Sequence, residues 1–215
     1  MTRGSFDRAH ALGRLGEEQF DVLVVGGGIT GAGVALDAAA RGLRTALVER
    51  GDFASGTSSQ SSKLVHGGLR YLQQREYRLV RENLAERRRL LANAPHLVRP
   101  LRFVLPLLGG GGATTAAVAR GYAAALWAYD LSGGLHLGRH RRLAPTEVHE
   151  ALPAVRRDLV AAGFSYPDAF TDDARLTLAV VRTAVLDHGA VAANYAPLAG
   201  VVEDGAGRVR AGVLA

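Results

Sequence analysis

A run of glycines directly after a short apolar segment constrains the fold of this chain more than any other feature. Residues 21–25 have the pattern of a buried strand, and Gly-Gly-Gly-Ile-Thr-Gly follows at positions 26–31. Residues 29–41 are rich in alanine and stop at Gly42, as is typical of a helix and its C-terminal end. Residues 45–49 form a second apolar strand. The pattern predicts a strand–helix–strand unit with a parallel sheet.

The spacing of the glycines predicts a binding site in this unit. Gly26 permits a tight turn, Gly28 lets a pyrophosphate approach the backbone, and Gly31 lets the helix lie close to the sheet. The helix N-terminus offers free N–H groups to an anion. Glu49 ends the second strand, where a carboxylate can accept hydrogen bonds from ribose hydroxyls; the alternative is a solvated acid. These features predict a dinucleotide site that disfavours NADP, and they leave FAD and NAD open.

The rest of the chain alternates helical and extended patterns. A polar loop is expected over 52–62. Expected helices cover 63–72, 76–91, 115–131, 145–151 and 172–188, and expected strands cover 101–107, 160–166, 191–202 and 208–214. Helix 76–91 has an apolar face that consists of Tyr77, Val80, Leu84 and Leu91.

The start of helix 172–188 carries two adjacent carboxylates. Thr171 is the expected cap of this helix. Asp172 and Asp173 follow it in the first turn, where acidic side chains interact favourably with the helix dipole. We therefore interpret this pair as a helix-start feature rather than as an acid–base pair.

Composition excludes several kinds of site. The absence of cysteine excludes disulfides, thiolate metal sites and a cysteine nucleophile. His136, His140 and His149 lack a recognisable metal-site spacing, and no metal site is expected. No stretch of about 18 uncharged apolar residues is present, so no transmembrane helix is expected.

The charge balance does not favour nucleic acid as a partner. The net charge is +6, and Lys63 is the only lysine among 26 basic residues. The arginines are spread along the chain without the interleaved aromatics of a nucleic-acid surface. This distribution favours a bias in codon usage, with attraction to anionic phosphates or lipid head groups as the alternative.

A second motif identifies a family. The run Ser-Ser-Lys-Leu-Val-His-Gly-Gly-Leu-Arg-Tyr-Leu at 61–72 resembles the signature of flavin-linked glycerol-3-phosphate dehydrogenases and the related glycerophosphate oxidases. Residues 94–97 and 171–176 are also similar to that family. The resemblance extends from about residue 21 to the end of the chain.

This resemblance implies an α/β fold: a glutathione-reductase-like, FAD-binding Rossmann domain with the start of an α+β substrate (cap) domain, truncated. Four parts are expected, with an N-terminal extension first and an FAD-binding part second. The third begins the cap region with a helical insertion, and the fourth returns to the FAD domain. Their ranges are 1–20, 21–100, 101–170 and 171–215. Because members of this family are longer, the chain is expected to be a fragment, and the alternative to a working enzyme is an inactive FAD-binding fragment.

The resemblance also implies roles for the hydroxyl-rich loop. Thr57, Ser58, Ser61 and Ser62 are expected to line the pyrophosphate and ribityl chain of FAD. The alternative is a turn whose hydroxyls bond only to the local backbone. Lys63 is expected close to the flavin, where a compact ammonium suits the space better than a guanidinium.

Two further residues carry the implied chemistry. His66 is expected near the isoalloxazine, in proton transfer from the substrate hydroxyl, or else as a structural histidine at a Gly-Gly turn. Arg70 is expected to bind the substrate phosphate, or else to pair with a nearby acid. Arg175 is expected to pair locally with acids.

The implied reaction is FAD-dependent oxidation of sn-glycerol 3-phosphate to dihydroxyacetone phosphate, with electrons passed to a quinone. Implied partners are the substrate, the quinone, the cytoplasmic face of the membrane by peripheral association, and a second copy of the chain in a homodimer. The alternative within the enzyme class is an oxidase that reduces oxygen.

Overall fold

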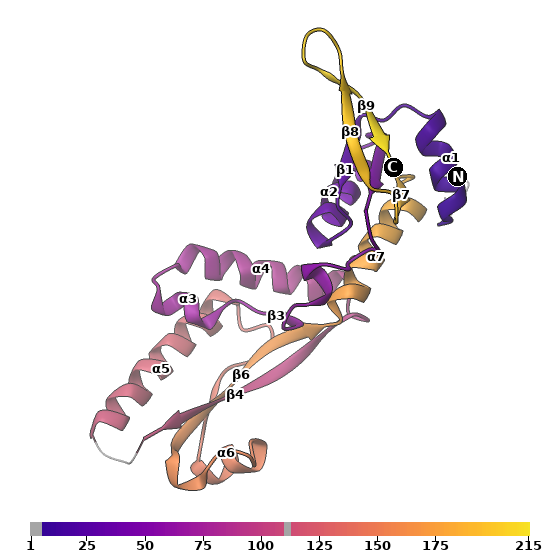
Figure 1. Cartoon of the computed structure of the whole chain (residues 1–215). Helices are drawn as coiled ribbons and strands as arrows, with labels where there is room; N and C mark the ends of the chain where they lie inside the picture. Colours follow the sequence, from indigo (N-terminus) through magenta and orange to yellow (C-terminus); the bar gives the residue numbers. More distant parts are fainter. Residues whose placement is uncertain (1–5, 110–112) are drawn as a thin grey trace. The chain divides into compact units, whose positions relative to one another are not determined.

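The computed structural model describes residues 6–109 and 113–215, which form two compact units. Unit 1 contains residues 6–63 and 172–215, and unit 2 contains the described residues of 64–171. Most helices and strands of both units are labelled in Figure 1. The functional parts expected from the sequence, with their boundaries at 100/101 and 170/171, stay predictions.

Unit 1 is built on a parallel sheet in the order β1-β2-β7, with β2 in the middle. The strands are β1 (Val22–Val25), β2 (Thr45–Val48) and β7 (Val191–Ala193). The predicted strand–helix–strand unit is confirmed, because α2 (Ile29–Ala40) connects β1 to its parallel neighbour β2.

Helices cover both faces of this sheet. Leu47 of β2 and Ala192 of β7 lie on the face covered by α2, where they pack with Ala35 of that helix. Helix α7 (Asp173–Leu186) packs against α2 through Ala184 and Ala39. The alternate residues, Val48, Val191 and Ala193, pack against Ala11 of helix α1 (Arg8–Glu17). This alternation follows from the two-residue period of a strand.

The C-terminal part of unit 1 is a hairpin. Strands β8 (Leu198–Glu203) and β9 (Val209–Leu214) pair in an antiparallel manner across the turn expected near Asp204. The single strand predicted over 191–202 was wrong, since the chain leaves β7 after Ala193 and resumes as β8. Tyr195 lies between them with φ 48°, which is incompatible with a continuous strand.

Unit 2 is built on an antiparallel sheet in the order β3-β6-β4, and β5 also pairs with β6. Its strands are β3 (Leu64–Val65), β4 (Val98–Leu108), β5 (Arg141–Leu143) and β6 (Val160–Thr171). The long pair β4–β6 places Val98 opposite Thr171 and Leu107 opposite Ala162. Strand β4 is longer than predicted and contains Pro100 and Pro106, which an edge strand tolerates.

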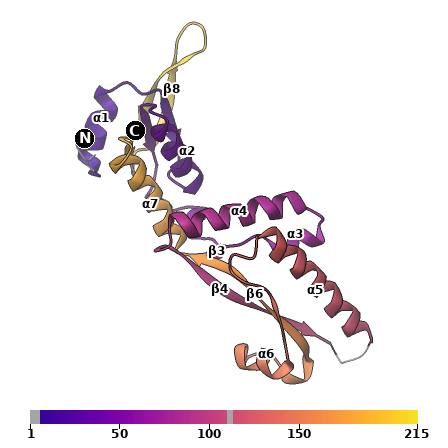
Figure 2. The same cartoon turned by 180° about the vertical axis from the view of Figure 1, so that it is seen from behind.

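Helices cover this sheet from both sides (Figures 1 and 2). They are α3 (Leu69–Gln73), α4 (Tyr77–Asn93), α5 (Ala113–Ser132) and α6 (Pro145–Ala151). Leu126 of α5 packs on Phe164 of β6, and α4 packs against α5 through Leu84 and Tyr129. On the opposite face of the sheet, Val148 of α6 packs against Leu143 and Val160.

Three details differ from the sequence-based expectations. The helix expected over 63–72 is divided into β3, a Gly-Gly turn and the five-residue α3, because Leu64 and Val65 pair with β6. Asp172, not Thr171, caps α7: its carboxylate accepts a hydrogen bond from the Arg175 amide at 3.1 Å. Tyr77 is 61% exposed and lies outside the apolar face of α4.

Candidate functional site

The turn between β1 and α2 is shaped by its glycines. Gly26 has φ 110°, a conformation that strongly favours glycine. A Cβ atom on Gly31 would lie 1.9 Å from the Gly26 carbonyl oxygen. A Cβ atom on Gly28 would lie 3.1 Å from the Ser58 hydroxyl oxygen. The backbone path into α2 therefore depends on residues without side chains.

The start of α2 presents backbone N–H groups. Within residues 6–109 and 113–215, the amides of Gly28, Thr30 and Gly31 have no hydrogen-bond partner. The Ile29 amide donates to the Ser58 hydroxyl oxygen at 2.8 Å. Free amides and the positive end of the helix dipole attract an anion. This turn can therefore bind a phosphate group beside the amide that Ser58 already occupies.

Glu49 lies directly after β2 and holds this turn from the other side. One carboxylate oxygen accepts a hydrogen bond from the Gly27 amide at 2.7 Å, and the other accepts one from the Gly51 amide at 2.8 Å. Each carboxylate oxygen can accept a further bond. Glu49 thus fixes two glycine-containing segments and keeps acceptor capacity for a ribose hydroxyl.

The hydroxyl-rich loop 52–62 contains both exposed hydroxyl side chains and one that is bonded to a distant residue. Thr57 and Ser62 are exposed, with Thr57 in a short 3₁₀ turn, η1 (Thr57–Ser59). Ser61 instead donates through its hydroxyl to the Asp173 carboxylate at 2.6 Å. Its side chain is thus held by the first turn of α7, a contact with a residue 112 positions away along the chain.

Lys63 shares this carboxylate. Its ammonium lies 2.5 Å from the other Asp173 carboxylate oxygen, and the Lys63 side chain is half exposed. The Lys63 ammonium, and after it the Ser61 hydroxyl, hold the pKa of the Asp173 carboxyl well below its usual range. The same pair raises the pKa of Lys63. Lys63 is therefore a cation held in place beside the helix start, and Asp173 does more than interact with the helix dipole.

His66 and Arg70 lie in unit 2, on the turn that leads from β3 into α3. Both side chains are exposed, and the Arg70 guanidinium lies 5.9 Å from the centre of the Tyr71 ring. Between them, Gly68 has φ 76°. A Cβ atom on Gly67 would lie 2.4 Å from a Leu84 methyl carbon. No acid pairs with Arg70 among the described residues, so the guanidinium is available to an anionic ligand.

A buried polar network binds the backbone of the turn between β3 and α3 at Gly67, and it was not predicted from the sequence. The Gly67 amide donates to the Tyr129 hydroxyl at 2.7 Å, and that hydroxyl donates to the Asp168 carboxylate at 2.6 Å. The Arg87 guanidinium donates to the other Asp168 oxygen at 2.5 Å and to the Pro167 carbonyl at 3.2 Å. Burial, and after it the Asp168 charge, raises the pKa of Tyr129 above its usual value.

One sequence signal could have revealed this network. Arg87 lies seven residues after Val80 and three after Leu84, which places it on the apolar face of α4. An arginine on a buried helix face requires a partner, since an unpaired buried charge is very costly. The identity of that partner, Asp168, is not readable from the sequence.

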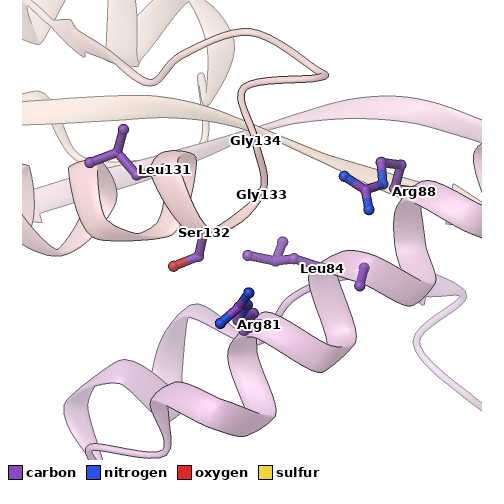
Figure 3. A pocket seen from close by; sticks show the side chains of 8 residues that line it. Arg81, Leu84, Arg88, Leu131, Ser132, Gly133 and Gly134 are labelled. Carbon is purple, nitrogen blue, oxygen red and sulfur yellow. The ribbon is translucent and has the colours of Figure 1, made fainter.

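Unit 2 also contains a second buried pair and a cavity. The His140 backbone amide and imidazole both contact the Asp130 carboxylate, at 2.8 and 2.7 Å. The cavity has a volume of about 510 Å³ and lies between α4 and the end of α5 (Figure 3). Its lining consists of Arg81, Leu84, Ala85, Arg88, Leu131, Ser132, Gly133 and Gly134. The cavity lining and the predicted site residues have no member in common.

The described ranges contain neither a metal-binding cluster nor a membrane-spanning helix. No group of three or more histidine, cysteine or acidic side chains has the geometry to hold a metal ion. No helix in the described part of the chain is both long enough and apolar enough to cross a membrane.

The parallel sheet, the glycine turn and the acid after β2 define unit 1 as a dinucleotide-binding unit of the Rossmann class. A family model, described as FAD dependent oxidoreductase, matches residues 21–215. The chain belongs to this family of FAD-dependent oxidoreductases.

Named relatives extend this result. The chain is 49% identical over 191 residues to glycerol-3-phosphate dehydrogenase 2 of Mycobacterium tuberculosis, which covers 87% of this chain and 32% of that protein. It is 45% identical over 185 residues to the mitochondrial glycerol-3-phosphate dehydrogenase of Rattus norvegicus, with 82% of this chain and 24% of that protein covered. The chain thus spans about a third or less of the length of these relatives.

Solved structures agree with the fold. The glycerol-3-phosphate dehydrogenase from Bacillus halodurans, complexed with FAD, matches with a TM-score of 0.69 and 35% identity. The match covers 96% of this chain and 32% of that one. The L-alpha-glycerophosphate oxidase from Mycoplasma pneumoniae, with FAD bound, matches with a TM-score of 0.65 at 19% identity, over 89% of this chain and 49% of that one. The α/β flavoenzyme fold expected from the sequence is confirmed.

Proposed function

We propose that this protein acts in the FAD-dependent oxidation of sn-glycerol 3-phosphate to dihydroxyacetone phosphate. The observation that carries the proposal is the start of α2, where three amides lack a partner among the described residues and lie in the turn that Glu49 holds through the Gly27 amide. Membership of the FAD-dependent oxidoreductases supports FAD as the cofactor. Relatives named as glycerol-3-phosphate dehydrogenases support the substrate.

The residues of unit 1 fit the adenosine diphosphate half of FAD. The amides of Gly28, Thr30 and Gly31 would bind the pyrophosphate, and Gly26 provides the turn that aims them. Glu49 would accept hydrogen bonds from the ribose hydroxyls. FAD, when bound, supplies the hydride acceptor of the reaction.

The hydroxyl-rich loop would complete the cofactor site. Ser58 already bonds to the α2 start, and Thr57 and Ser62 are exposed and free to contact the pyrophosphate or the ribityl chain. Ser61 and Lys63 are held by Asp173; Ser61 would line the pyrophosphate and ribityl chain, and Lys63 would lie close to the flavin. An ammonium near a flavin would stabilise negative charge there.

Two side chains of unit 2 would act on the substrate. Arg70 would bind the phosphate group by two parallel N–H···O bonds, since its guanidinium has no acidic partner among the described residues. His66 would accept the proton of the substrate hydroxyl, because a neutral imidazole has one ring nitrogen free to accept a proton. The turn between them keeps both side chains at the surface of unit 2.

The electron acceptor and the surroundings are further parts of the proposal. Electrons pass to a quinone, and the protein is cytoplasmic with peripheral attachment to the inner face of the cell membrane, as a homodimer. The net charge of +6 supports contact with anionic head groups.

The cofactor assignment is tested by competition. FAD is titrated into the purified protein while flavin fluorescence is followed, with ADP and FMN as competitors. We expect ADP to displace FAD and FMN to compete weakly, because the site in unit 1 fits the adenosine half. Displacement by FMN but not by ADP would contradict the assignment.

The reaction is tested on the flavin-loaded protein. Dye reduction is measured with glycerol 3-phosphate and with glycerol, and peroxide release is measured in parallel with oxygen as acceptor. We expect dye reduction with glycerol 3-phosphate only, and a raised KM for Arg70→Lys because a lysine cannot make the bidentate contact. Rapid peroxide release would instead support an oxidase, and no reduction by either substrate would support an inactive FAD-binding fragment.

A further inference from the structure

The buried network below residues 66–70 joins three elements of unit 2 to one backbone amide. Arg87 comes from α4, Tyr129 from α5 and Asp168 from β6, and all three side chains are buried. We propose that Tyr129 is a positioning residue: its hydroxyl, held by Asp168 and Arg87, fixes the turn that carries His66 and Arg70. This inference rests on the proposed function for the roles of His66 and Arg70.

The direction of each hydrogen bond in the network is determined by its chemistry. The Gly67 amide can only donate, so the Tyr129 oxygen accepts at 2.7 Å. The Tyr129 hydroxyl then donates its single proton to an Asp168 carboxylate oxygen at 2.6 Å. The Arg87 guanidinium supplies the balancing charge. A chain of bonds that ends in an ion pair is stronger than the same bonds made separately.

The turn depends on this network because it has little stability of its own. Helix α3 has five residues, too few for a stable isolated helix. His66 and Arg70 are exposed, so packing of their own side chains does not fix them. Leu69, Tyr71 and Leu72 pack on the cluster that contains Tyr129. The ring of Tyr129 therefore supports α3, and its hydroxyl fixes the residue immediately after His66.

The substitution Tyr129→Phe removes only the hydroxyl. It leaves the Gly67 amide and one Asp168 oxygen buried without their partner. Tyr166→Phe is the matched control: its ring lies edge-on to Tyr129 with centroids 6.1 Å apart. Within the two described ranges, the Tyr166 hydroxyl makes no hydrogen bond. Both variants lose one oxygen atom from the same aromatic cluster.

The direct measurement is hydrogen exchange at the Gly67 amide, by NMR on the flavin-loaded protein. We expect exchange about tenfold faster or more in Tyr129→Phe, because the Gly67 amide loses its hydrogen bond to the Tyr129 hydroxyl. The amides of the β4–β6 ladder keep their wild-type rates, and Tyr166→Phe leaves Gly67 unchanged. Unchanged Gly67 exchange in Tyr129→Phe, or an equal rise at all amides, would overturn the inference.

The kinetic measurement separates positioning from general stability. With glycerol 3-phosphate, Tyr129→Phe is expected to lower kcat and raise KM, so that kcat/KM falls by about tenfold. The kcat/KM of Tyr166→Phe is expected to stay within about twofold of wild type. Equal kinetics for the two variants would overturn the role in catalysis. If the wild-type protein oxidises no glycerol 3-phosphate, the proposed function fails, and Gly67 exchange still decides whether Tyr129 fixes the turn.

Discussion

The substitution Gly31→Ala tests the close approach of α2 to the preceding turn. Alanine normally stabilises a helix interior by about 1 kcal/mol relative to glycine. At position 31, however, the new Cβ atom would lie 1.9 Å from the Gly26 carbonyl oxygen, whereas real Cβ contacts essentially never fall below 3.0 Å. The gap must open by 1.1 Å, the difference between these two distances, and the atom that must move belongs to the backbone.

The magnitude follows from these opposing effects. Overpacking of a rigid site costs about 3 kcal/mol at the upper end of its usual range. After the gain in helix propensity of about 1 kcal/mol, the net loss is about 2 kcal/mol. For a chain of this size, that loss lowers the melting temperature by about 4–8 °C.

Gly33→Ala is the matched control in the same helix. Nothing lies within 4 Å of a Cβ atom at that position, and Gly33 is exposed. This variant is expected to gain about 0.5–1 kcal/mol and to melt a few degrees higher. Thermal melts of wild type and both variants, followed by circular dichroism at 222 nm, give the comparison. A Gly31→Ala protein that melts at or above wild type would refute the reasoning.

Three further substitutions test the ion pairs. Because the folded-state pKa of Asp173 is lowered, its carboxylate contributes stability above its unfolded pKa of about 3.9, and that contribution is lost as the pH falls. Wild type should therefore lose more stability than Asp173→Asn between pH 6 and pH 3 in urea unfolding, and equal losses would contradict the pairing with Lys63. Arg87→Met should cost about 3–5 kcal/mol, since it leaves Asp168 charged and buried. Arg89→Met should cost less than about 1 kcal/mol, because its pair with Glu86 is exposed. Similar urea midpoints for Arg87→Met and Arg89→Met would show that the buried pair contributes no more stability than the exposed one.

The local patterns in the sequence predicted unit 1 well. The β1–α2–β2 unit has the expected strands, helix and order because its signals are local: apolar runs, a glycine turn and an alanine-rich helix. Strand β3 was missed because it has two residues and forms only by pairing with β6, about 100 positions later in the chain. Strand β4 was predicted too short because Pro100 is a breaker in most contexts and is tolerated here at a sheet edge.

The candidate site shows the same division. The sequence marked Ser61 and Lys63 as polar groups of interest, but Asp173 binds both only because the fold brings α7 to this loop. The apolar face predicted for its helix did not include Arg87, although the position of Arg87 relative to Leu84 places it on the buried face. Local sequence patterns do not show which residues, distant along the chain, become hydrogen-bond or ion-pair partners in the fold.

The construction of unit 1 from two separate chain segments has a consequence for biosynthesis. Strand β2 pairs with β7, and these strands lie about 140 residues apart, so at about 5–20 residues per second the ribosome needs roughly 7–30 s to deliver β7. During that interval the nascent β2 has an unpaired side, and Val48 has no β7 neighbour to pack beside. A half-made sheet of this kind is a natural substrate for chaperones, whereas unit 2, encoded without interruption, can fold as soon as β6 emerges.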